Sequence, residues 1–385
     1  MTLDGATAES FAHSIVMRTK KHSHQTSFFD PRLPTDVELA DKLSWAKERP
    51  KIDLHRHLLG SITPDMFRFI CKRHNISLLT KHGEELDDII TIRERVDGLQ
   101  PFFRPWPTLS SLLVEPSVLT TVTYLVLREA AKDNIVYTEL RATWGMTARE
   151  KFSVKQFLAA IQAGLVQAEQ DFGIIGRVVL GITRHLFGRH TLDHRRRLWA
   201  NILNAASQYR DSVVVGFDVS GVELHHPVSL YTKELSEITE AAFPLTIHCG
   251  ETTPASDVRA ALQVKPVRLS HALSAAADPL LLEHLANNNV VVEACPTTNW
   301  LTQTVDKIEQ HPVLDMFDHG VPVTLATDNP AIVGTTLSRE YALVLKLTRL
   351  SELDVGILIT NAHKFMFGNS TIRAIVGKKI GGMSS

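Results

Sequence analysis

Four histidines and two carboxylates follow short apolar runs of this sequence, at positions where parallel strands would end. His55 and His57 are two residues apart, so in a strand both side chains lie on one face and can reach the same ion. His248, His271 and Asp328 each end a later run. Three neutral imidazoles and one carboxylate suit Zn²⁺ or another borderline divalent ion, with one position left for water. The predicted ligands are therefore His55, His57, His248 and Asp328.

Residues near these predicted ligands have side chains that can donate or accept protons. A bound divalent ion lowers the pKa of water from about 15.7 toward about 7. We expect His271 to orient that water and to carry its proton. Glu251 lies three residues past His248 and would act as an acid or a base. Glu251, His271 and Asp328 are the predicted catalytic residues.

Eight apolar runs would form the strands that carry these residues, and segments with helical spacing separate most of them. This alternation favours an α/β fold of the (β/α)8 TIM-barrel type over an open doubly wound sheet, because no glycine-rich phosphate turn is present. The loops after the strands of such a barrel converge on one pocket. The predicted strands span residues 51–55, 134–142, 176–183, 213–219, 244–248, 267–271, 290–294 and 322–327. The helices predicted after residue 150 span 154–170, 191–208, 231–241, 256–263, 278–287 and 311–318.

Other segments flank or interrupt this pattern. Residues 1–50 are polar and would form an N-terminal extension with one helix, at 35–48. Residues 51–385 would form a single metal-dependent barrel domain that ends in closing helices over 338–380. The mainly helical region before residue 133 contains Phe102 and Phe103 between prolines, where they could cover a binding pocket.

Composition and charge exclude several classes of protein. With 44% hydrophobic and 22% charged residues, the chain has the composition of a globular protein. A formal net charge of -1 leaves no basic surface for nucleic acid or an anionic membrane. The three cysteines lack metal-binding spacing, and neither a signal peptide nor a membrane-spanning run is evident. We therefore expect a cytoplasmic protein, either a monomer or a homodimer, that binds a small and roughly neutral ligand.

Taken together, the motifs at the strand ends resemble those of the adenosine deaminase family in the amidohydrolase superfamily. The resemblance is carried by His-x-His-x-x-Gly at 55–60, His-x-Gly-Glu at 248–251, Ser-His-Ala at 270–272 and Thr-Asp-x-Pro at 327–330. Further matches lie at 137–141, 183–185 and 215–223, and the whole resemblance covers residues 50 to 375.

This resemblance implies one catalytic zinc ion per chain and hydrolytic deamination of an amino-substituted purine or purine-like heterocycle, with release of ammonia. Water would add to the amino-bearing ring carbon while Glu251 protonates the adjacent ring nitrogen. Gly221 would approach the ring through its backbone. The other common zinc deaminase pattern, His-x-Glu with Pro-Cys-x-x-Cys, is absent, because Cys295 has no partner cysteine nearby.

Two residues depart from the family pattern and bear on the substrate. Leu59 replaces an acid that usually hydrogen-bonds the substrate, and a leucine cannot accept a hydrogen bond from a ribose hydroxyl. Asn329 replaces a second aspartate, and its amide always carries donors as well as an acceptor. A modified adenine derivative is therefore favoured over adenosine. The candidate substrate contacts are Gly221, Asn329, Leu59, Phe102 and Phe103.

Three other functions stay open at this point. Adenosine deaminase proper needs another group to bind the sugar in place of Leu59. A barrel metallohydrolase that opens a cyclic amide or ester would use the same metal site, although Glu251 and His271 suit protonation of a ring nitrogen better. A non-catalytic ligand-binding relative is expected to lose a metal ligand or the acid first, and all of them are present.

Overall fold

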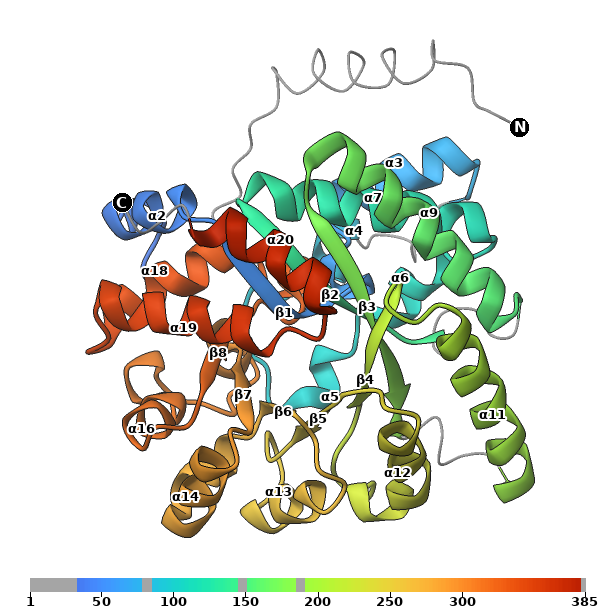
Figure 1. Cartoon of the computed structure of the whole chain (residues 1–385). Helices are drawn as coiled ribbons and strands as arrows, with labels where there is room; N and C mark the ends of the chain where they lie inside the picture. Colours follow the sequence, from blue (N-terminus) through green and yellow to red (C-terminus); the bar gives the residue numbers. More distant parts are fainter. Residues whose placement is uncertain (1–32, 78–84, 145–150, 185–190, 382–385) are drawn as a thin grey trace.

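Eight parallel strands pair in chain order, each with the next, and helices surround them (Figure 1). This computed structural model describes residues 33–77, 85–144, 151–184 and 191–381. The arrangement confirms the predicted (β/α)8 TIM-type barrel. The strands are β1 (Lys51–His57), β2 (Ile135–Ala142), β3 (Ile175–Thr183), β4 (Val214–Ser220), β5 (Leu245–Cys249), β6 (Arg268–His271), β7 (Val291–Ala294) and β8 (Val323–Leu325).

The first and last strands differ from the predicted ranges at their carboxyl ends. β1 runs past the predicted end at residue 55 and includes both His55 and His57. β8 is shorter than the predicted 322–327, because only Val323–Leu325 keep the strand conformation. The chain turns just beyond, where Asp328 has a φ of 57°. Left-handed backbone of this kind does not fit a strand.

Main-chain hydrogen bonds between β1 and the segment after β8 close the barrel. The amide of His57 donates to the carbonyl of Asp328 over 2.7 Å, and the amide of Asp328 donates to the carbonyl of His55 over 2.8 Å. His271, at the end of β6, has a φ of 64° and is also left-handed. Non-glycine residues in this conformation are uncommon and cost about 1–3 kcal/mol, so the surrounding structure must hold them there.

The helices that connect the later strands match the predicted ranges to within two residues at each end. Ser153 caps the first of them with a capping box in which Gln156 is the partner. These helices are α9 (Val154–Phe172), α11 (Leu192–Gln208), α12 (Thr232–Glu240), α13 (Ala255–Leu262), α14 (Pro279–Asn287) and α16 (Val313–Asp318). Short 3-10 turns are η1 (Leu59–Ser61), η2 (Val228–Tyr231), η3 (Leu273–Ala277) and η4 (Ile308–Gln310).

The region between β1 and β2 is helical, as predicted, and it carries a cluster of aromatic side chains. The ring of Phe102 is 6.2 Å from that of Phe103 and 5.8 Å from that of Trp106. Prolines occupy the first turn of three of its helices. A backbone N–H at that position has no acceptor within the helix, so its absence in proline costs no helical hydrogen bond. The helices are α3 (Pro64–His74), α4 (Leu86–Ile90), α5 (Leu99–Phe102), α6 (Trp106–Ser111) and α7 (Pro116–Lys132).

The predicted N-terminal helix begins later than expected, and most of the predicted extension over 1–50 lies outside the described residues. α2 (Ala40–Glu48) packs against α18 (Leu337–Leu347). The buried ammonium of Lys51 ties it to the barrel by donating to the carbonyls of Ala46 and Arg49, each over 2.8 Å.

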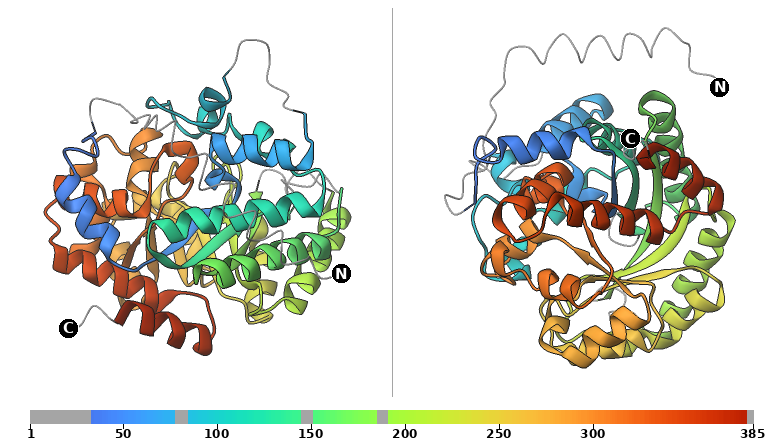
Figure 2. Two further views of the ribbon diagram at one scale, coloured as in Figure 1. Left: turned by 90° about the horizontal axis from the view of Figure 1, so that it is seen from above. Right: turned by 60° about the vertical axis from the view of Figure 1, so that its left-hand side comes forward.

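The last two of the closing helices predicted over 338–380 pack at the amino end of the barrel (Figures 1 and 2). Ile52 and Tyr137, near the starts of β1 and β2, pack with Ile372 and Val376 of the last helix. The remaining helices are α15 (Pro296–Leu301), α17 (Pro330–Val333), α19 (Glu352–Phe365) and α20 (Ser370–Ile380). With its amino end covered in this way, the barrel leaves its carboxyl end for a ligand.

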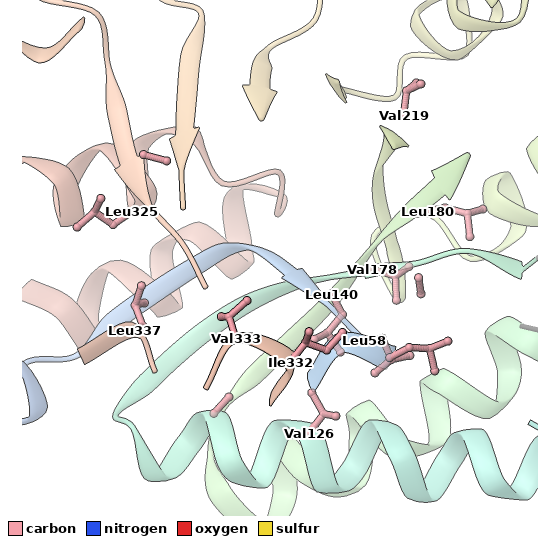
Figure 3. Close-up of a cluster of buried hydrophobic side chains, with 14 of the residues drawn as sticks. Leu58, Val126, Leu140, Val178, Leu180, Val219, Leu325, Ile332, Val333 and Leu337 are labelled. Carbon is pink, nitrogen blue, oxygen red and sulfur yellow. The ribbon is translucent and has the colours of Figure 1, made fainter. Parts of the chain in front are cut away.

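A larger apolar core lies between the strands and their surrounding helices. Figure 3 shows part of it, including Val126 of α7, Leu58 and Leu140. This packing fixes the strands, and through them the positions of the residues at their carboxyl ends. Within the described ranges, no helix combines the length and apolar character needed to cross a bilayer.

Candidate active site

Three donor atoms from β1 and the segment after β8 converge on one point. His55 Nε2 and His57 Nε2 lie 3.3 Å apart. Asp328 Oδ1 lies 3.1 Å from the first nitrogen and 3.2 Å from the second. Donor atoms bound to a tetrahedral zinc ion are separated by about 3.4 Å. The three atoms therefore have the spacing of ligands around one small ion.

Two more histidines join this group from β5 and β6. Donor atoms of His55, His248, His271 and Asp328 all lie within 4.8 Å of one another, and all four residues are buried. The ring of His248 is 4.7 Å from that of His55 and 5.5 Å from that of His57. The structure thus brings the four predicted ligands together with His271. Both His57 and His271 lie close enough to be considered as the third imidazole.

Buried carboxylates hold the Nδ1 atoms of two of the histidines that are predicted to be ligands. Asp218 Oδ1 lies 3.0 Å from His248 Nδ1, and Glu293 Oε2 lies 3.3 Å from His55 Nδ1. A ring whose Nδ1 donates to a carboxylate leaves Nε2 free for a metal ion. Burial lowers the pKa of His248 to about 4, although Asp218 opposes the shift. His248 is therefore a neutral donor at physiological pH, as a metal ligand must be.

Arg141 of β2 lies between these two carboxylates. Its guanidinium pairs with Asp218 over 2.7 Å and also with Glu293. Arg268 Nε adds a second cation 2.7 Å from Glu293 Oε1. Although burial raises the pKa of Glu293, Arg141 and Arg268 hold it well below its usual range. Glu293 therefore stays ionised and can accept a hydrogen bond from Nδ1 of His55, one of the predicted ligands.

Glu251 follows β5 in a loop that Glu223 holds in place. The Glu223 carboxylate accepts from the amide of Thr252 over 2.9 Å and from the amide of Glu251 over 3.4 Å. Burial raises the pKa of Glu251 well above its usual range, and the charges of Glu223 and Asp328 raise it further. A carboxyl group that keeps its proton near neutral pH can donate it to a substrate.

Leu59 lines a small cavity beside the carboxyl end of β1. Its side chain is 7% exposed and shares the cavity wall with His57 and Trp106. Phe102 and Phe103 are not among the described residues that line this cavity. Phe102 is buried and stacks against Trp106 instead. A substrate contact by these two phenylalanines stays a prediction.

Asn329 and Gly60 are in close contact beside the predicted metal ligands. A β-carbon at Gly60 would lie 2.0 Å from Asn329 Oδ1, so the glycine of the first motif makes room for the amide. Among the described residues, Asn329 Oδ1 has no hydrogen-bond partner although it is buried. Gly221, directly after β4, has a φ of 92°, which glycine adopts without strain. Their predicted contacts with a substrate stay predictions.

Several residues of the site were not predicted from the sequence. Glu293 interrupts an apolar strand, and a charge at such a position needs a buried partner, so this signal was present. Asn299, in α15, lies with its Nδ2 3.2 Å from both Glu251 Oε1 and His271 Nδ1, and no pattern in the sequence indicates this position. His185, part of a matched motif, lies outside the described residues.

Comparisons with known proteins agree with this geometry. The family model described as adenosine deaminase matches residues 50–380. An adenosine deaminase of Enterococcus faecalis is 28% identical over 88% of this chain and 97% of its own length. An aminodeoxyfutalosine deaminase of Streptomyces avermitilis is 29% identical over 92% of this chain and 97% of its own. The solved N6-methyl-AMP deaminase of Arabidopsis thaliana is 26% identical, covers 89% of this chain and 99% of its own, and superposes with a TM-score of 0.74.

Proposed function

The chain belongs to the adenosine deaminase family, and from that premise we propose that it hydrolyses the amino group from a purine or purine-like heterocycle at a single zinc ion. The observation that carries this proposal is the convergence of His55, His57 and Asp328 at mutual distances of 3.1–3.3 Å, next to a buried carboxyl group. The relatives described above are named as deaminases of adenosine, aminodeoxyfutalosine and N6-methyl-AMP, which supports the same reaction.

The donor set fits zinc. His55, His57, His248 and Asp328 would hold the ion, and three imidazoles with one carboxylate are typical of zinc rather than of magnesium or calcium. Bound zinc supplies water with a lowered pKa, so that a nucleophile is available at neutral pH. The carboxylates behind His55 and His248 keep these rings in the tautomer that a ligand requires.

Glu251 would act on the ring of the substrate. Protonation of the ring nitrogen next to the amino-bearing carbon makes that carbon more electrophilic, so that water adds to it. The carbon keeps the oxygen of the water, and the amino group leaves with a proton as ammonia. The burial that raises the pKa of Glu251 keeps its carboxyl group protonated for this step.

Leu59 would determine which kind of substituent on the heterocyclic ring the site accepts. It lines the cavity next to His57, and Trp106 supplies a second apolar surface there. A hydroxyl placed against these two side chains would lose its hydrogen bonds to water, at a cost of about 1–3 kcal/mol. We therefore propose an adenine derivative whose substituent is apolar or lacks the hydroxyl that an acid would bind.

A screen for ammonia release would test the function. Purified protein loaded with zinc is expected to release ammonia from at least one compound in a panel of aminopurines, their nucleosides and nucleotides, aminopterins and aminopyrimidines. Adenine derivatives with apolar substituents should react faster than adenosine. A complete lack of ammonia across the panel, from protein that has bound zinc, would contradict the proposed function.

Replacing Leu59 with aspartate should change the preference between substrates. An acid at this position can accept a hydrogen bond from a sugar hydroxyl, so the ratio of kcat/KM for adenosine to kcat/KM for a 9-alkyladenine should rise about tenfold. Leu224→Asp is the matched control, because Leu224 is 59% exposed and the same change there leaves the cavity intact. An unchanged ratio in folded, zinc-loaded Leu59→Asp protein would remove Leu59 from the specificity argument.

A further inference from the structure

Asn299 connects the predicted acid with the predicted water-orienting histidine. It is fully buried at the start of the loop region after β7, in α15. Its Nδ2 lies 3.2 Å from Glu251 Oε1, 3.2 Å from His271 Nδ1 and 3.3 Å from Thr304 Oγ1. Its Oδ1 lies 3.2 Å from His311 Nε2. One amide therefore contacts both predicted proton-transfer groups.

The orientation of the Asn299 side-chain amide follows from the tautomer of His311, which a backbone N–H group fixes. The amide N–H of Val313 donates to His311 Nδ1 over 3.1 Å, so that nitrogen carries no proton. The proton of His311 is then on Nε2, which donates to Asn299 Oδ1. With its oxygen fixed toward His311, Asn299 turns its N–H groups toward Glu251 and His271.

This orientation determines where the protons of the two catalytic residues lie. An amide nitrogen can only donate, and a protonated Nδ1 on His271 would place two N–H groups against each other at 3.2 Å. His271 Nδ1 is therefore an acceptor, and the proton of the neutral ring lies on Nε2. By the same argument Glu251 Oε1 accepts from Asn299, which leaves Oε2, 3.7 Å from His271 Nε2, to carry the carboxyl proton.

We propose that Asn299 is a positioning residue that fixes His271 as a hydrogen-bond donor to the reacting oxygen and presents the proton of Glu251 on Oε2. His271 then neither binds the ion nor removes a proton from water. The third imidazole of the metal site is accordingly His57, whose Nε2 lies 3.2 Å from Asp328 Oδ1. The sequence predicts two roles for His271, which are to orient the water and to carry its proton. Of these, His271 keeps the first and does not have the second.

The proton balance then rests on Glu251. Its Oε2 proton moves to the ring nitrogen, and the resulting carboxylate takes one proton from the water that adds to the ring carbon. The second proton of that water leaves with the amino group as ammonia. His271 donates to the oxygen throughout and ends in the tautomer in which it began. This part of the inference rests on the proposed function, whereas the tautomer of His271 is a property of the resting protein.

Nitrogen NMR of protein labelled with ¹⁵N in histidine tests the tautomer directly. In the zinc-loaded protein, His271 is expected to show a protonated Nε2 and an unprotonated Nδ1. Asn299→Leu, which has similar volume and no donors, should lose this tautomer preference. Its kcat should fall about 10²-fold, with KM and bound zinc close to those of the unchanged protein.

Asn361→Leu is the matched control for this substitution. Asn361, in α19, is part-buried and donates from Nδ2 to the carbonyl of Val323, at the start of β8, over 3.0 Å. It should leave the His271 nitrogen shifts and kcat unchanged. His311→Gln and His311→Leu give a second comparison if Asn299→Leu does not fold. Glutamine can still donate to Asn299 Oδ1 and should preserve the tautomer, whereas leucine should not.

Two results would overturn the proposal. One is a His271 that carries its proton on Nδ1 or binds zinc through Nε2 in the unchanged protein. The other is full kcat in Asn299→Leu protein. Failure of the proposed function is a separate result, since a chain that releases no ammonia from any amino-heterocycle can still show the expected tautomer.

Discussion

Replacing Asp328 with alanine is expected to abolish ammonia release and to leave the protein without bound zinc. Asp328 Oδ1 lies within 3.2 Å of both His55 Nε2 and His57 Nε2, so this anionic donor faces both rings. Its loss leaves only imidazole ligands and removes the charge that favours a divalent cation. Without the ion, no nucleophile is generated at neutral pH, and turnover should fall by more than about 10³-fold.

The backbone at Asp328 requires a second variant. Its φ of 57° lies in the left-handed region, which asparagine and aspartate tolerate better than alanine does. Asp328→Asn therefore keeps the conformation while it removes the charge, and it should also lose zinc and activity. Zinc per chain is measured by elemental analysis after dialysis, with exposed Asp315→Asn as the control. Wild-type zinc content in both Asp328 variants would exclude this residue as a ligand.

Replacing Glu251 with glutamine is expected to lower kcat by about 10³-fold while zinc binding and folding are retained. Glutamine has the same shape and can still accept from Asn299, which lies 3.2 Å from Glu251 Oε1. It cannot deliver a proton to a ring nitrogen or take one from water. The carboxyl group of Glu251 is suited to that role because burial and two neighbouring carboxylates raise its pKa.

Measurement of kcat, KM and zinc content on one preparation of Glu251→Gln protein shows whether the lower activity comes from lost catalysis, weaker substrate binding or lost zinc. A lowered kcat with unchanged zinc is the expected pattern for an acid that acts on the substrate. Glu309→Gln, an exposed substitution of the same chemistry, should leave all three quantities unchanged. A nearly normal kcat in Glu251→Gln protein would mean that another group protonates the ring.

The meeting of the predicted metal ligands was predictable because the fold imposes a simple rule on their positions. Strands of a parallel barrel end at one rim, so the residues that end each apolar run meet there even when they are far apart in the chain. His55, His57, His248 and Asp328 follow this rule, and the structure brings them together. The motifs at the same positions also predicted the family that the comparisons support.

The residues that orient these ligands were harder to predict. Asp218 and Glu293 act through the far nitrogens of histidines, and such pairings depend on side-chain directions inside the barrel rather than on spacing along the chain. Asn299 lies in α15 and His311 lies just before α16, and the spacing of residues along the chain does not indicate that these two side chains meet. Sequence periodicity determines the elements, whereas these contacts depend on how loops pack over the rim.

Reaction in water labelled with heavy oxygen, with ammonia and product measured together, tests the central claim most directly. Hydrolytic deamination predicts one ammonia per product, and one labelled oxygen on the ring carbon that carried the amino group. Protein from which zinc has been removed should give neither product until zinc is restored. A ring-opened product, or a product that forms without an equal amount of ammonia, would contradict the account.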